Sequence, residues 1–150
     1  MKILVTGGNG FIGQHIVAEL TKRNIGVISY DLVPPKYQLP DVSYVIGTVL
    51  DEFALANALK SCDGVFHLAA ILGVKRADTN LLNCLTVNIE GTLTVLRAAV
   101  ISGVKRVLLT SSSEVFGLFK IPFNSIRLTL YLSTICFLLI FFTIIDFLAI

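Results

Sequence analysis

The sequence predicts an α/β fold in three layers, with a doubly wound parallel sheet between layers of helices. Two observations support this prediction. Short apolar runs alternate with segments of helical periodicity along residues 1–117, which is the pattern of strand–helix–strand units. A cluster of glycines, TGGNGFIG at residues 6–13, stands where the first apolar run meets the first helical segment. We expect the strand order 3-2-1-4-5, with the sheet incomplete on its carboxyl-terminal side.

The first half of this region supplies three strands and one helix. KILVT, residues 2–6, is a short apolar run that ends in glycines, which suits a buried parallel strand. Residues 11–23 have apolar side chains at helical spacing. IGVISYD, residues 25–31, is the second strand and ends before PPK, because proline cannot continue a ladder. SYVIGTV, residues 43–49, is the third strand.

The second half continues the alternation with two helices and two strands. EFALANALKS, residues 52–61, is a short helix, and GVFHLAA, residues 64–70, is the fourth strand. A long helix is expected over residues 80–102, where Gly103 ends it as a C-cap. KRVLLTSS, residues 105–112, is the fifth strand, so the pattern agrees with a parallel sheet covered on both faces.

Composition and charge exclude several functional classes. The chain has 150 residues and a net charge of +2, which gives no reason to expect nucleic acid or a polyanionic partner. Cys62, Cys84 and Cys136 have neither paired nor CxxC spacing, which indicates reduced thiols and argues against a disulfide framework or a zinc site. The amino-terminal apolar run is too short for a secretory signal. We therefore expect a cytoplasmic protein without a metal.

The glycine cluster predicts a nucleotide site. Gly7, Gly10 and Gly13 satisfy TGxxGxxG, and Gly8 also completes GxGxxG. Such a chain turns tightly out of a strand, brings its backbone close to a pyrophosphate and packs a helix on the sheet, and a Cβ is penalised at each point. The helix amino terminus offers free N–H groups to the phosphates. Asp31 follows Gly13 by eighteen residues, where an acid binds both adenosine ribose hydroxyls and repels a 2′-phosphate, so NAD is favoured over NADP.

Four motifs in order resemble those of the extended short-chain dehydrogenase/reductase superfamily, of the NAD-dependent epimerase/dehydratase type. TGGNGFIG resembles the nucleotide-binding turn of its Rossmann domain, and VFHLAA, residues 65–70, resembles its fourth-strand motif. VNIEGT, residues 87–92, resembles its NxxGT helix motif, and TSSSEVFG, residues 110–117, resembles its active-site motif. The resemblance covers residues 1–117 and implies an enzyme that oxidises a hydroxyl of a nucleotide-linked sugar, or a related hydroxy compound, with NAD.

The resemblance also implies which residues meet the cofactor and the substrate. The cofactor contacts that it implies are Gly7, Gly10, Phe11, Ile12, Gly13, Asp31, Leu68, Ala69, Ala70, Asn88 and Ser111. Ser112 matches the catalytic Ser/Thr that hydrogen-bonds the reacting hydroxyl or carbonyl. Glu114 has two open interpretations, an acid/base group or an exposed carboxylate of a loop.

Several other polar residues of the motifs have structural interpretations. For Asn88, a role in bonding nearby backbone is favoured over a direct catalytic role. His67 lies inside an apolar strand and is expected to be a packed, hydrogen-bonded residue rather than a base. Asp51 resembles the second acid of the family's GDxxD-type segment, whose first acid, which would help to hold adenine, is Thr48 here.

The catalytic YxxxK pair of the family is missing from the sequence after Ser112. In that pair the Tyr is the general acid/base, and the Lys lowers its pKa from about 10. Tyr131 is the only tyrosine after Ser112, Ile135 stands four residues further on, and no lysine follows Lys120. We therefore expect no turnover by this chain alone. The oligomeric state stays open, because many relatives pair through helices that include the one with the Tyr and Lys.

Residues 118–150 form an apolar tail with only three charged residues, Lys120, Arg127 and Asp146. Three interpretations stay open. In the first, residues 128–145 form a membrane helix of about 27 Å, close to the roughly 30 Å of a bilayer core. The chain would then be a catalytically dead NAD-binding module tethered to a membrane. Alternatively, the tail is translated from AT-rich non-coding sequence. In the third interpretation it is a buried helix or strand, although its pattern fits neither well.

Overall fold

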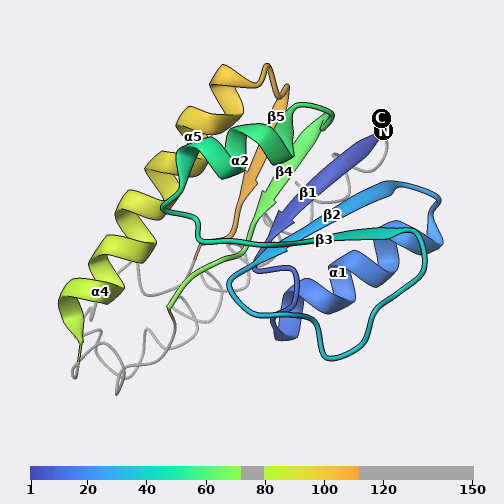
Figure 1. The fold of residues 1–150 in the computed structure, drawn as a ribbon, viewed down its shortest axis with the longest axis horizontal. Helices are drawn as coiled ribbons and strands as arrows, with labels where there is room; N and C mark the ends of the chain where they lie inside the picture. The colour runs from blue at the N-terminus through green and yellow to red at the C-terminus, as the bar shows by residue number, and fades with distance from the viewer. Residues whose placement is uncertain (72–79, 112–150) are drawn as a thin grey trace, which may run out of the picture. The chain divides into compact units, whose positions relative to one another are not determined.

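A computed structural model of the chain describes residues 1–71 and 80–111. In these residues, a five-stranded parallel sheet has the predicted order β3-β2-β1-β4-β5 (Figure 1). The strands are β1 (Lys2–Thr6), β2 (Gly26–Asp31), β3 (Val42–Ile46), β4 (Gly64–His67) and β5 (Arg106–Leu109). The helices are α1 (Phe11–Lys22), α2 (Glu52–Leu59), α4 (Leu81–Leu85) and α5 (Gly91–Ile101), with a π-helical turn, η1 (Thr86–Glu90), between the last two.

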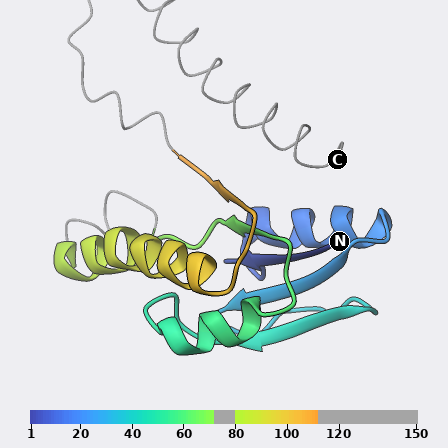
Figure 2. The same ribbon diagram turned by 90° about the horizontal axis from the view of Figure 1, so that it is seen from above.

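Helices cover both faces of the sheet, which gives the predicted three-layer α/β architecture. Figure 2 shows α1 on one side of the sheet and α2 on the other. Because successive strand residues point to opposite faces, Leu4 points to the side opposite that of its neighbours Ile3 and Val5. All three are fully buried.

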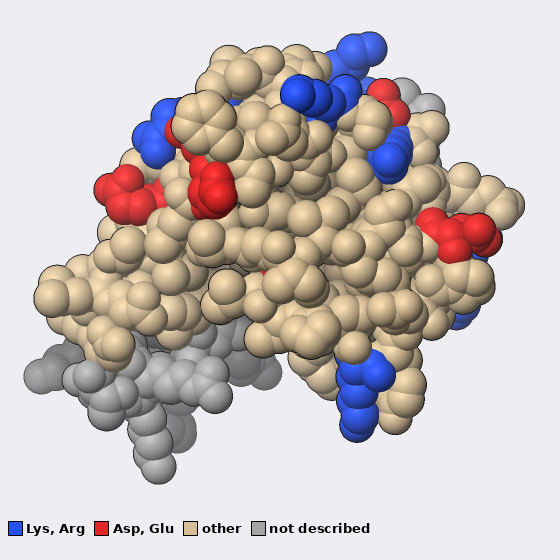
Figure 3. Space-filling view, in the orientation of Figure 1, with Lys and Arg blue, Asp and Glu red and all other residues tan. Residues whose placement is uncertain are grey.

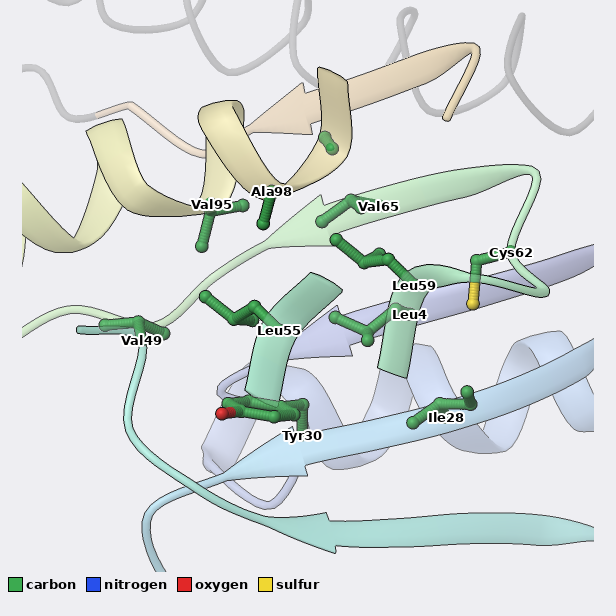
Figure 4. Close-up of a cluster of buried hydrophobic side chains, with 11 residues drawn as sticks. Leu4, Ile28, Tyr30, Val49, Leu55, Leu59, Cys62, Val65, Val95 and Ala98 are labelled. Atoms are coloured by element: carbon green, nitrogen blue, oxygen red, sulfur yellow. The ribbon is translucent and has the colours of Figure 1, made fainter. Parts of the chain in front are cut away.

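A cluster of buried apolar side chains lies between the sheet and the layer of α2 and α5 (Figure 4). Strand residues and helix residues contribute to it in about equal numbers. Its buried members are Leu4, Ile28, Tyr30, Val49, Leu55, Leu59, Cys62, Val65, Val95, Ala98 and Ala99. This cluster fixes the sheet against its helices and so holds the carboxyl ends of the strands in place.

The long helix that the sequence predicts over residues 80–102 is present as the helical stretch Leu81–Ile101. It contains the π-helical turn η1 and ends at the C-cap Ser102, after which Gly103 has φ +69°, as expected for its position. In the described part of the chain, this is the one helix long and apolar enough to cross a membrane. That is weak evidence for a span, because α5 packs against α2 and buries Val95, Ala98 and Ala99 in the core.

Met1–Leu109 forms one compact unit, and Thr110–Ile150 forms a second unit, of which only the first two residues are described. The division at residue 117 and all three interpretations of residues 118–150, the membrane helix over 128–145 included, lie outside the described residues and stay predictions. On the face seen in Figure 3, acidic and basic side chains are scattered and do not gather into a patch of one sign.

Candidate functional site

The carboxyl ends of β1, β2 and β4 meet at one edge of the sheet. Thr6, the last residue of β1, is in register with Tyr30 of β2 and with His67 of β4. The chain order reverses between β1 and β4, and ligands of open α/β sheets bind outside the carboxyl ends of the strands at such a point. The residues that follow these strands therefore form the candidate site.

The glycine turn after β1 leaves no room for a side chain at Gly7 or at Gly13. Gly7 has φ +68°, and its N–H donates to the carbonyl of Tyr30 over 2.9 Å. A Cβ on Gly7 would lie 2.9 Å from the backbone nitrogen of Ala69, and a Cβ on Gly13 would overlap the carbonyl oxygen of Gly7. The turn, the start of α1 and the segment after β4 thus approach one another through bare backbone.

The amino terminus of α1 is open at this edge. Its N-cap, Gly10, makes no side-chain cap, and the first turn holds no acidic residue. Phe11 and Ile12 are exposed at 81% and 59%. The first N–H groups of a helix have no intrahelical acceptor and point along the axis with a partial positive charge. This end of α1 therefore suits an anionic group such as a phosphate.

Asp31 lies beside the glycine turn at the end of β2. Its Oδ2 accepts from the backbone N–H of Asn9 at 3.0 Å, and its Oδ1 accepts from the N–H of Val33 at 3.1 Å. The side chain is only half-buried. An ionised carboxylate offers about four acceptor positions, so two remain for ligand hydroxyls.

His67 joins the ends of β1 and β4 to the helix that follows. Its Nδ1 lies 2.7 Å from Oγ1 of Thr6, and its Nε2 lies 3.0 Å from Oγ1 of Thr92. Thr92 donates its hydroxyl hydrogen to the carbonyl of Asn88, so Nε2 must carry the imidazole hydrogen and Nδ1 must accept from Thr6. Burial lowers the pKa of His67 to about 4. The predicted packed, hydrogen-bonded histidine is confirmed.

The segment after β4 is held by one backbone bond to β1, from the N–H of Leu68 to the carbonyl of Thr6 at 3.1 Å, and by two side chains. Oγ1 of Thr6 accepts from the N–H groups of Leu68 and Ala69 at 3.2 and 3.3 Å. The amide of Asn88 accepts from the N–H of Ile71 at 2.8 Å and donates to its carbonyl at 3.1 Å. The backbone-bonding role expected for Asn88 is therefore observed, although its partner lies seventeen residues away.

The predicted site residues divide into two groups. The first group lies together at one edge of the sheet. It comprises the glycine turn with the start of α1, the carboxylate at the end of β2, and the segment after β4 with its exposed Ala70. Ser111 is exposed after β5, whereas Ser112 and Glu114 lie outside the described residues. The cofactor and catalytic roles of all these residues stay predictions. In the described ranges, no group of His, Cys, Asp and Glu could hold a metal.

Three polar residues of this edge were missed by the sequence analysis. Asn9 sits inside the glycine turn, and its side chain bonds both Ser29 and the carbonyl of Val33. Thr6 and Ser29 are completely buried polar residues within apolar strands. A hydroxyl in a buried strand and an amide among glycines were the signals available, because each needs a partner when it is buried.

The proteins to which this chain is similar are longer polypeptides. A family model described as the NAD dependent epimerase/dehydratase family matches residues 3–132, fifteen residues beyond position 117. UDP-N-acetyl-alpha-D-glucosaminuronate decarboxylase of Bacillus cytotoxicus is 36% identical over 139 residues, which are 89% of this chain and 43% of that protein. The 3-beta-hydroxysteroid dehydrogenase of Mycolicibacterium neoaurum is 34% identical over 119 residues, 76% of this chain and 32% of its own length.

Solved structures similar to this chain are also longer than it. MoeE5 in complex with UDP-glucuronic acid and NAD superposes with a TM-score of 0.73 at 36% identity, over 78% of this chain and 38% of its own. The chain thus spans less than half the length of the relatives that it matches.

Proposed function

The chain belongs to the NAD-dependent epimerase/dehydratase family, and from this premise we propose that it binds NAD as the nucleotide-binding part of an oxidoreductase. The substrate class that we propose is a nucleotide-linked sugar. MoeE5 is complexed with UDP-glucuronic acid, and the Bacillus cytotoxicus relative is named for a UDP-sugar acid, which supports this class.

One observation supports NAD binding above all others. The Cβ positions of Gly7 and Gly13 are filled by backbone, so the turn presents bare backbone beside the open amino terminus of α1. The N–H groups of Phe11 and Ile12 would hold the pyrophosphate, and Asp31 would accept from the adenosine ribose hydroxyls. When bound, NAD supplies a hydride acceptor. The residues of the chain bind and orient it, and Leu68 to Ala70 would line its nicotinamide half.

Ligand titration of the whole chain tests this proposal. We expect NAD to bind and to raise the unfolding temperature, and NADP to bind at least about tenfold more weakly because the Asp31 carboxylate repels its 2′-phosphate. Asp31→Asn should narrow the difference between NAD and NADP. The matched control is Asp41→Asn, which changes an exposed aspartate away from the site. A folded chain that shows no NAD-dependent shift contradicts the proposal.

We further propose that the chain alone does not turn over substrate. The support is the missing YxxxK pair, since Ile135 stands where a lysine would follow Tyr131 by four residues. Without a neighbouring cation a tyrosine stays protonated at neutral pH and is a poor base. Formation of NADH, followed by its absorbance, should be absent when the chain is given NAD with UDP-glucuronic acid. Steady NADH production would refute inactivity and leave NAD binding intact.

A second candidate is a catalytically dead NAD-binding module held at a membrane. The observation that favours it is the length of the uncharged run at residues 128–145. The full chain, expressed with liposomes of neutral lipid, should then float with the vesicles and resist extraction at high pH. Recovery only in the soluble fraction or in aggregates excludes the tether.

A further inference from the structure

Asn9 connects the glycine turn to the end of β2 through three separate groups. Its backbone N–H donates to Oδ2 of Asp31 at 3.0 Å. Its amide nitrogen donates to the carbonyl of Val33 at 2.7 Å, and its amide oxygen accepts from the hydroxyl of Ser29 at 2.7 Å. Neither α1 nor any other helix takes part in these contacts. The turn is therefore tied to β2 by this residue in addition to the single bond from Gly7 to Tyr30.

The chemistry of the partners fixes the orientation of the Asn9 amide. A backbone carbonyl only accepts, so the amide nitrogen must face Val33. The amide oxygen then faces Ser29, whose hydroxyl donates to it. Ser29 is completely buried, and Gly8 lies so close that a Cβ there would overlap the Ser29 hydroxyl oxygen. The amide is thus held at both ends and has one arrangement.

The same residues hold the Asp31 carboxylate. Its two oxygens accept from the N–H groups of Asn9 and Val33, and these two residues are joined to each other by the Asn9 side chain. The bonds form a closed ring of three residues that sets the rotation of the carboxylate. These two backbone bonds occupy two of the roughly four acceptor positions of the carboxylate, so the others can accept from a ligand.

We propose that Asn9 is a positioning residue for cofactor selectivity, which aims the Asp31 carboxylate at the 2′-hydroxyl of the adenosine ribose. The inference rests on the proposed function, since it needs a chain that binds NAD. Asn9 acts through Asp31 and not by contact with the ribose. Loss of its side chain leaves the Asp31 charge and its two backbone N–H donors in place but removes the bonds that tie these donors to each other and to Ser29, so the donors no longer fix the rotation of the carboxylate.

The test compares two ligands in two proteins, with the full chain throughout. The ligands are NAD and the NAD analogue whose adenosine ribose lacks the 2′-hydroxyl. In the wild type we expect removal of this hydroxyl to weaken binding about tenfold or more, because a hydrogen bond to a charged group is lost. In Asn9→Ala, removal of the same hydroxyl should weaken binding by less than about threefold. The quantity compared between the proteins is thus the ratio of the two dissociation constants, that of the analogue to that of NAD. An equal loss in both proteins overturns the inference, because a merely structural residue would weaken both ligands alike.

Controls keep the outcomes distinct. Asn9 does not have a positive φ, so alanine is compatible with its backbone. Asn57→Ala, which changes an exposed asparagine of α2, should keep the wild-type ratio. If Asn9→Ala fails to fold, Ser29→Ala frees one end of the amide and should reduce the ratio, and an unchanged ratio there overturns the inference. A wild type that binds NAD without sensitivity to the hydroxyl refutes the inference alone, whereas a folded wild type that binds no NAD refutes the proposed function with it.

Discussion

Two glycines with nearly the same backbone angle have different surroundings. Comparing them separates the cost of a left-handed backbone for a side-chain-bearing residue from the cost of steric overlap with a neighbouring segment. Gly7 has φ +68° and Gly103 has φ +69°. A Cβ on Gly7 would lie 2.9 Å from the nitrogen of Ala69, whereas a Cβ on Gly103 would meet nothing within 4 Å. Only Gly7 is therefore constrained both by its own backbone and by a neighbouring segment.

Alanine at these positions should destabilise the chain to different extents. Gly103→Ala should lower the free energy of unfolding by about 1–2 kcal/mol, the cost of a left-handed conformation. Gly7→Ala should cost about 1–3 kcal/mol more, because the turn must also move away from the segment after β4. Urea unfolding of the full chain measures both values. Equal losses would show that the overlap at Gly7 is relieved without cost.

At this scale the sequence predicted the backbone of the site better than its side-chain contacts. Gly7 and Asp31 follow from motif spacing, because their roles depend on the local turn and the end of one strand. Asn9 and Ser29 contact each other only because β1 and β2 pair in register, from Lys2 with Gly26 to Thr6 with Tyr30. Periodicity along one chain does not report that alignment.

At the scale of elements, Asp51 has a local role at the start of α2. It is the N-cap, and its Oδ1 accepts from the N–H of Ala54 at 2.9 Å. A carboxylate at this position satisfies one free N–H of the helix and interacts well with its dipole. Asp51 therefore has two possible roles, the cofactor role that the family resemblance implies and the helix-capping role that the structure shows.

Substitution of this cap distinguishes the two roles. Asp51→Ala should lower the free energy of unfolding by about 1 kcal/mol and leave the affinity for NAD nearly unchanged. Asp51→Ser keeps an oxygen that can cap the helix and should recover most of the loss. Chemical denaturation and NAD titration measure the two quantities. A large drop in affinity with unchanged stability would assign Asp51 to the cofactor instead.

The carboxyl ends of β3 and β4 each lie three residues before their predicted positions. The fourth strand was expected over residues 64–70 but ends at His67. The N–H of Leu68 still donates to the backbone carbonyl of Thr6 at 3.1 Å, whereas the N–H of Ala69 donates to the Thr6 hydroxyl at 3.3 Å. The third strand ends at Ile46 rather than at residue 49. The π-helical turn η1 was not predicted, since apolar spacing does not distinguish it from an α-helix.

At the scale of the whole molecule, the alternation of strands and helices predicted the order of the sheet. The right-handed crossover rule and short connections leave few topologies for this pattern. What the sequence could not supply is the joining of distant segments by polar side chains. The link from Thr6 through His67 to Thr92 is one example, and it ties the two halves of the sheet to the helix that follows.

Global stability should depend on pH through His67. The pKa of this histidine is about 4 in the folded chain, lowered by burial from 6.5, so the unfolded chain binds a proton first. The contribution of His67 to the free energy of unfolding is therefore fully present above about pH 6.5. As the pH drops to about 4, this contribution is lost and the free energy of unfolding falls by up to roughly 3 kcal/mol. Denaturant unfolding across this range measures the slope. Below about pH 4 both states hold the proton and this contribution stays constant.

Histidine variants isolate this effect from the titration of carboxylates. His67→Gln should be less stable at pH 7 but show a shallower loss between pH 6.5 and 4, because the glutamine does not titrate. His15→Gln, which makes the same change at the exposed histidine of α1, is the matched control. A slope for His67→Gln equal to that of the wild type would contradict the assignment.

The position of β1 at the centre of the sheet has a consequence for synthesis on the ribosome. Ile3 pairs with Val27 on one side but with Gly64 on the other, so its second neighbour is made 61 residues later. At about 5–20 residues per second, that interval is on the order of 3–12 s. For these seconds an apolar strand edge of the nascent chain has no partner. Chaperones at the ribosome therefore have longer access to the unpaired edge of β1 than to that of β2 or β4, the other two interior strands of the described sheet.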